Sequence, residues 1–76
     1  MGIIRNVKIS SGNGTVEQGL EGNLEYKQID LSVKPGLAGK LKNGAFYTLT
    51  DGTKTWKAVY SGTDGSLVHF KVAEEH

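Results

Sequence analysis

The side chains most able to do chemistry are one histidine and six carboxylates. His69 is the only histidine inside the chain, and general acid–base catalysis would need two titratable groups held close together. The carboxylates open to such a role are Glu17, Glu21, Glu25, Asp30, Asp51 and Asp64. Most of them lie in turns, and Asp51 and Asp64 each precede a glycine, where an aspartate supports the turn backbone. A Ser-His-Asp arrangement around His69 can be drawn only because serines and aspartates are abundant, so we expect no catalytic residues and no enzyme.

Phosphate-binding and metal-binding motifs are equally weak. Residues 36–41 contain two glycines and a lysine but lack the spacing and the Ser or Thr of a phosphate-binding loop. Residues 12–19 do not match a dinucleotide-binding fingerprint, because the third glycine is misplaced and no crossover helix follows. The absence of cysteine, with a single internal histidine, does not supply a transition-metal site, and the spacing of a calcium loop is missing. We therefore expect no metal and no cofactor.

The chain that must position these side chains is small and nearly neutral. It has 76 residues, 11 glycines and a formal net charge of +1, which is no global signature of a nucleic-acid or membrane partner. The charge is unevenly distributed: residues 11–33 carry four carboxylates and one lysine, whereas residues 34–57 carry five lysines and one aspartate. Two explanations stay open. Either facing strands neutralise each other within the fold, or the acidic part of one subunit contacts the basic part of the next.

Turn residues divide the chain into short β-strands. Turns rich in Gly, Asn and Asp recur about every ten residues, with β-branched and aromatic residues between them. The expected strands cover residues 3–9, 24–33, 45–50, 55–60 and 66–73, and residues 37–41 form at most one helical turn. This pattern predicts an all-β fold with a single domain over residues 1–73 and a frayed tail over residues 74–76. Five strands ending in a three-stranded antiparallel meander resemble a small SH3-like or OB-like barrel or sandwich.

Two stretches of the N-terminal half are harder to assign. The apolar residues of 24–26 lie at even positions, whereas those of 29–33 lie at odd positions, so a regular strand would send the two sets to opposite faces. We expect a β-bulge or sharp bend near Lys27 and Gln28 to restore the phase. Residues 11–23 fit either an ordered edge strand or a mobile loop.

The hairpin between residues 45–50 and 55–60 has a definite expected register. A four-residue loop over residues 51–54 places Leu49 opposite Trp56. The same register places Phe46 opposite Val59, so that apolar side chains match across the strands. A two-residue turn would instead place lysines opposite these apolar residues.

The last hairpin has two possible registers. Tyr60 lies opposite either Ser66 or Val68, and the sequence does not choose between them. Both registers predict the same inner face, which consists of Tyr47, Leu49, Trp56, Ala58, Tyr60, Val68, Phe70 and Val72.

The outward face of this meander is the candidate partner-binding site. Phe46, Val59 and Leu67 form a small apolar patch on a face that would otherwise be polar. The polar residues that could share a contact with them are Lys57, His69 and Lys71. Three interpretations compete for this patch. The N-terminal strand or the Gly-rich loops cover it, it binds protein or a second copy, or it binds nucleic acid with Phe46 and His69 as stacking platforms.

These features favour a non-enzymatic protein-binding or self-assembling module, with a small nucleic-acid-binding barrel as the alternative. A chain of this size without disulfides gains stability by burying an apolar patch against another subunit, so we expect a homo-oligomer. Small β proteins without catalytic residues are commonly accessory or structural components, those of virions and phages among them. The first residues contain no long apolar stretch, so we expect neither a signal peptide nor a membrane span, and a cytoplasmic location.

Overall fold

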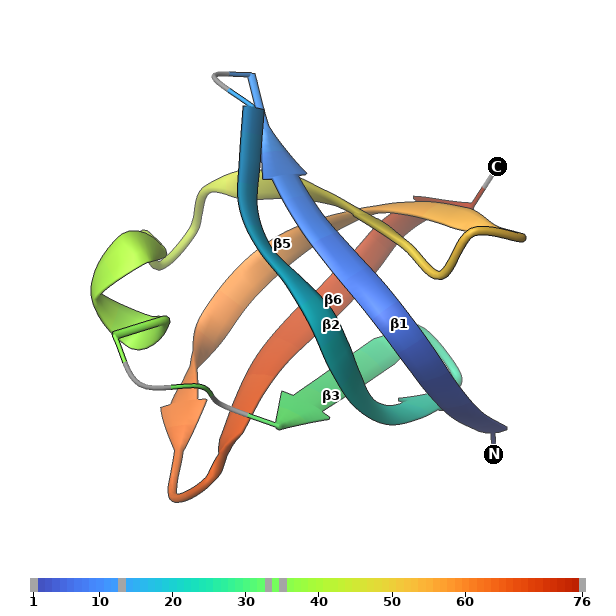
Figure 1. Ribbon diagram of the computed structural model, residues 1–76, viewed down its shortest axis with the longest axis horizontal. Helices are drawn as coiled ribbons and strands as arrows, with labels where there is room; N and C mark the ends of the chain where they lie inside the picture. Colours follow the sequence, from blue (N-terminus) through green and yellow to red (C-terminus); the bar gives the residue numbers. More distant parts are fainter. Residues whose placement is uncertain (1, 13, 33, 35, 76) are drawn as a thin grey trace.

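The chain folds into a closed β-barrel of six antiparallel strands (Figure 1). The computed structural model describes residues 2–12, 14–32, 34 and 36–75. The elements are β1 (Gly2–Ser11), β2 (Gly14–Glu25), β3 (Gln28–Ser32), η1 (Ala38–Lys40, a 3₁₀ turn), β4 (Phe46–Thr50), β5 (Thr55–Asp64) and β6 (Leu67–Glu75). The predicted all-β barrel is confirmed, but it has six strands where five were expected.

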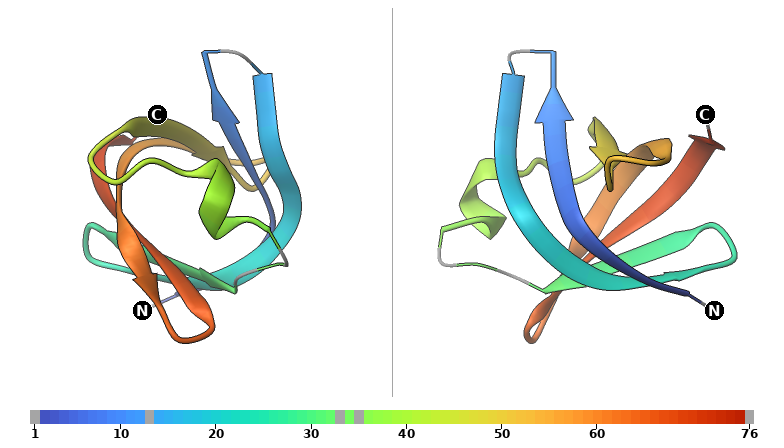
Figure 2. Two further views of the ribbon diagram at one scale, coloured as in Figure 1. Left: turned by 90° about the vertical axis from the view of Figure 1, so that its left-hand side faces the viewer. Right: turned by 45° about the vertical axis from the view of Figure 1, so that its right-hand side comes forward.

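Two three-stranded meanders make up the barrel. The circular order β1-β2-β3-β6-β5-β4 joins them along two seams, where β3 pairs with β6 and β1 pairs with β4. The return of β4 to the side of β1 gives a Greek-key connection. Figure 2 (left) looks into the barrel and shows β1 and β2 on the side away from β5 and β6. β2 and β5 are therefore three strands apart in either direction around the barrel.

Alternation of buried and exposed residues along the strands places one apolar set inside the barrel. The predicted inner face is confirmed, because seven of its eight residues are buried and Val72 packs half-buried against them. The Phe70 ring lies at its centre, with ring centroids 5.6 Å from Tyr60 and 6.2 Å from Tyr47. The first meander and the segment around η1 add further buried residues, which include Ile4, Val7, Ile9, Leu20, Ile29, Leu31, Leu37 and Leu41.

The register of β4 and β5 agrees with the prediction. Leu49 lies opposite Trp56, Phe46 lies opposite Val59, and the loop between the strands spans residues 51–54. The segment expected to hold at most one helical turn contains η1, whose three residues match that expectation.

Both registers predicted for the last hairpin are wrong. Tyr60 lies opposite Phe70 rather than Ser66 or Val68, because β5 continues to Asp64 and the turn is made by residues 65–66. Register shifts between Lys57 and Ala58 and beyond Tyr60 insert extra residues into the ladder. The inner face survives these shifts because its residues keep a spacing of two on each strand, at 56, 58 and 60 on β5 and at 68, 70 and 72 on β6.

The predicted strand over residues 24–33 is two strands joined by a turn. Glu25 lies opposite Gln28, so Tyr26 and Lys27 form a two-residue hairpin turn where a β-bulge or sharp bend within one strand was expected. Cross-strand pairing of Leu24 with Ile29 places both apolar residues toward the core and accounts for the change from even to odd positions. Residues 14–25 are an ordered strand, which supplies the sixth strand of the barrel.

The C-terminal strand extends past the predicted end of the domain. β6 reaches Glu75, which lies opposite Trp56, and the Lys54 ammonium lies 3.5 Å from the Glu75 carboxylate. The tail predicted to fray from residue 74 is therefore paired through residue 75, and residue 76 lies outside the described residues.

Candidate functional site

Paired residues on three neighbouring strands, β4, β5 and β6, contain the apolar part of the predicted site. Phe46 on β4 lies opposite Val59 on β5, and Val59 in turn lies opposite Lys71 on β6. The Phe46 side chain is 56% exposed, although it belongs to a regular strand, and Val59 is half-buried beside it. The row thus presents an exposed aromatic ring, an aliphatic side chain and a cation on the outer surface.

Lys57 adds a second cation beside this row, two residues before Val59 on β5. Its ammonium lies 5.1 Å from the centroid of the Phe46 ring, within the range of a cation–π contact. Glu74 lies opposite Lys57 on β6, so a carboxylate borders the cations at this end. We call Phe46, Lys57, Val59 and Lys71 the Phe46 surface.

The remaining two predicted site residues lie toward the other end of β6. His69 lies opposite Asp30 of β3, and the half-buried Leu67 lies opposite Ser32. Leu67 is four residues from Lys71 along the strand, or about 13 Å at the rise of a β-strand. The structure therefore separates the six predicted residues into the Phe46 surface and a second group beside β3.

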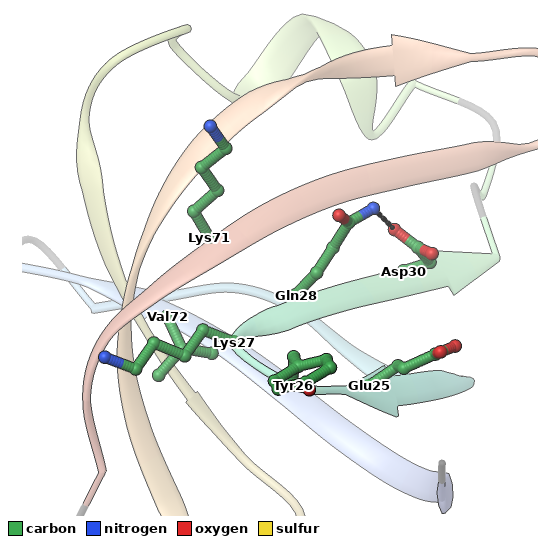
Figure 3. Close-up of a pocket in the computed structure, with 7 residues that line it drawn as sticks. All are labelled: Glu25, Tyr26, Lys27, Gln28, Asp30, Lys71 and Val72. Atoms are coloured by element: carbon green, nitrogen blue, oxygen red, sulfur yellow. Dashed lines mark hydrogen bonds between the residues drawn. The ribbon is translucent and has the colours of Figure 1, made fainter.

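His69 and Asp30 form a close pair that was not predicted from the sequence. The His69 Nδ1 atom lies 2.5 Å from the Asp30 Oδ1 atom, and the Gln28 amide donates a hydrogen bond of 3.0 Å to the same oxygen (Figure 3). Burial raises the pKa of the Asp30 carboxyl, but hydrogen bonds from Gln28 and His69 and the charge of His69 outweigh it. The pKa of Asp30 consequently lies below its ordinary value.

This pair is not extended into a catalytic triad by the neighbouring serine. The Ser61 hydroxyl donates a hydrogen bond of 3.1 Å to the backbone carbonyl of His69, not to its imidazole ring. Among residues 2–12, 14–32, 34 and 36–75, no three His, Cys, Asp or Glu side chains gather where they could hold a metal ion. The pair instead joins β3 to β6 across one seam of the barrel.

The N-terminal strand leaves the Phe46 surface open. β1 meets β4 edge to edge, through the pairing of residues 8–10 with residues 48–50, and so lies beside the outer face of β4 rather than over it. More than half of the Phe46 side chain is exposed, so the N-terminal strand does not cover this residue as one interpretation expected.

Two exposed apolar residues were missed from the sequence. Ile3 on β1 is 72% exposed, and Tyr26 at the β2–β3 turn is 98% exposed. Tyr26 borders an open groove of about 620 Å³ that also includes Glu25, Lys27 and Lys71 (Figure 3). The signal that could have located Tyr26 was the change from even to odd apolar positions, which a two-residue turn explains as well as a bulge does.

The acidic strand β2 does not pair with β4 or β5, but Lys34 of the basic segment donates a hydrogen bond of 2.8 Å to the Gln18 carbonyl on β2. β2 carries Glu17, Glu21 and Glu25 without a lysine or arginine, and its neighbours are β1 and β3 rather than β4 or β5. The ion pairs found within the described part of the chain are Lys54 with Glu75 and His69 with Asp30. Neither pair joins the acidic strand to the basic segment over residues 34–57.

Comparison with protein-family models, with curated proteins and with solved structures gave no match to this chain. Within the described ranges, the structure contains no helix that has both the length and the apolar character needed to cross a membrane.

Proposed function

We propose that this chain is a non-enzymatic binding and assembly module that presents the Phe46 surface to protein, in the first place to further copies of itself. The observation that carries the proposal is the 56% exposure of Phe46 beside Val59 on a regular part of the barrel wall. Aromatic side chains surrounded by polar groups are enriched at protein interfaces. A structural or accessory role in the cytoplasm, as in a virion or phage particle, is the setting that this proposal envisages.

The size of the chain supports self-association. A barrel of 76 residues without disulfides buries a smaller fraction of its surface than a larger domain does, and a subunit contact adds to that burial. Phe46 and Val59 are adjacent across two strands, so one contact can cover both side chains.

Nucleic-acid binding is the alternative, and two contacts argue against it. The Lys57 ammonium lies over the Phe46 ring, which a base would have to reach in order to stack. His69, the second predicted stacking residue, is paired with the carboxylate of Asp30, which repels phosphate. Binding of single-stranded oligonucleotides that weakens steeply with salt, with a smaller slope in Lys57→Ala or Lys71→Ala, would favour this alternative.

The proposal is tested by sedimentation velocity of the wild type and of Phe46→Asp over a concentration series. The wild type should self-associate at high micromolar concentration. Phe46→Asp should weaken the association about tenfold to a hundredfold, because it removes the burial of one aromatic side chain, worth about 1.5–3 kcal/mol.

Phe46→Leu is the matched control, because it keeps an apolar side chain at the same exposed position. It should retain most of the association, while circular dichroism shows the same β-barrel in both variants. A wild type that remains monomeric at these concentrations would refute self-association through this surface.

A further inference from the structure

The Tyr26 side chain makes little contribution to the fold of its own subunit. It is 98% exposed, and within the described residues it forms neither a hydrogen bond nor a ring contact. Its backbone has a φ of +56° at the first position of a two-residue turn, where glycine is favoured over a bulky side chain. An exposed aromatic ring held at this position is well suited to contact a partner.

The strand that leads into this turn supplies an acidic surface. Glu21, Asn23 and Glu25 alternate with less exposed residues along β2 and share its outer face. In the described part of the chain, neither Glu21 nor Glu25 takes part in an ion pair. We call Glu21, Glu25 and Tyr26 the Tyr26 surface.

The Tyr26 surface and the Phe46 surface are complementary in chemistry. The Phe46 surface offers an exposed ring and an aliphatic neighbour with Lys57 over the ring, whereas the Tyr26 surface offers an exposed ring with two carboxylates, bordered by Lys27 and Lys71. Contact between Tyr26 of one copy and the Phe46–Val59 pair of another would bury all three apolar side chains. Glu25 is adjacent to Tyr26 in the chain, just as Lys57 is adjacent to Phe46 in space, so the charges would meet at the border of the same contact.

The positions of the two surfaces decide the symmetry of such a contact. β2 lies three strands from β5, on the opposite side of the barrel (Figure 2). Tyr26 on one side and the Phe46–Val59 pair on the other can therefore each be covered by a different copy, although Lys71 borders both surfaces. Contacts between two different surfaces are heterologous and produce rings or open filaments rather than closed dimers.

We infer that the occupant of the Phe46 surface is the Tyr26 surface of a second copy of this chain, in a head-to-tail assembly. This inference rests on the proposed function, because it requires the Phe46 surface to bind protein. It adds the identity of the partner surface and the heterologous symmetry of the contact.

The test combines two variants that each damage one surface. Phe46→Asp damages the first, and the double variant Tyr26→Gly/Glu25→Lys damages the second. Each variant alone should sediment as a monomer, with association weakened at least about tenfold. An equimolar mixture should form a one-to-one heterodimer that grows no further, because each variant retains the surface that the other one lacks.

Two controls separate this result from unfolding and from a general effect of charge. Tyr26→Gly removes an unfavourable φ without loss of packing, so the double variant should melt about 2–8 °C higher than the wild type in dilute solution. Lys40→Glu makes a charge change of the same size at an exposed position of η1 and should leave the assembly unchanged.

Three outcomes would overturn the inference. If the double variant assembles like the wild type while Phe46→Asp does not, the Phe46 surface binds protein but its occupant is not the Tyr26 surface. If both variants are monomeric and their mixture is also monomeric, the contact is not heterologous. If Phe46→Asp itself assembles like the wild type, the proposed function fails together with this inference.

Discussion

At the scale of the residue, Asp51 organises the loop between β4 and β5 with one carboxylate oxygen. Its Oδ1 atom accepts hydrogen bonds from the backbone amides of Lys54 at 2.8 Å and Thr53 at 2.9 Å, and these bonds lower the pKa of the carboxyl. Asp51→Ala removes the acceptor, so we expect the free energy of unfolding to fall by about 1 kcal/mol and the Tm by about 4–8 °C. Thermal denaturation followed by circular dichroism measures both.

Asp51→Asn keeps an oxygen acceptor at this position but removes the charge. The pKa of Asp51 in the folded chain lies below the unfolded value of about 3.9, so its charge stabilises the fold above that pH. This contribution is lost as the pH falls through the folded pKa. The wild type should therefore melt above Asp51→Asn at about pH 6, by a margin that shrinks as the pH is lowered toward about 2, whereas a constant difference would contradict the role of the charge.

At the scale of the element, β2 and β3 pack too closely at Gly22 for any side chain. A Cβ atom at this position would lie 1.8 Å from the carbonyl oxygen of Asp30. Gly22→Ala should force the two strands apart and lower the free energy of unfolding by about 3 kcal/mol, as judged by urea denaturation. Gly12→Ala is the matched control, since nothing lies within 4 Å of its Cβ position, and it should change stability by less than about 0.5 kcal/mol. Equal effects of the two substitutions would show that the close approach is not what requires glycine.

Element assignment from the sequence worked where apolar side chains match across strands and failed where the ladder is irregular. The register of β4 with β5 was predictable because Leu49 and Trp56 are both large and apolar. The register of β5 with β6 was not, because bulges change the residue count without leaving a clear composition signal. β2 was uncertain because Leu20 is its only fully buried residue, so its alternation is weak.

The candidate site was likewise predictable only in part. The outward position of Phe46 and Val59 follows from alternation along a strand, and that part could be predicted. The contact of His69 with Asp30 joins residues 39 positions apart, so it required the order of the strands around the barrel. Tyr26 was included in a continuous strand with a β-bulge or bend near Lys27 and Gln28, so its exposure at a hairpin turn was not predicted.

At the scale of the whole molecule, the two meanders are joined unequally. The β3–β6 seam contains five registered pairs and the contact of His69 with Asp30, whereas the β1–β4 seam contains three registered pairs. Local opening follows the least stabilised part of a structure, so we expect the barrel to open first between β1 and β4. Native-state hydrogen exchange should then show lower protection for amides of residues 48–50 than for those of residues 29–31.

A covalent link across the shorter seam tests this order of opening. Ser10 and Thr48 are registered partners, so their Cα atoms lie about 4.5–5.5 Å apart, within the range of a disulfide. The chain has no cysteine, so Ser10→Cys/Thr48→Cys would form a single bond. Oxidation should raise the protection of residues 48–50 about tenfold or more, with the reduced form as the control, because the link prevents separation of β1 from β4. If oxidation leaves their exchange unchanged, the amides of β4 become exposed by a motion other than the parting of this seam.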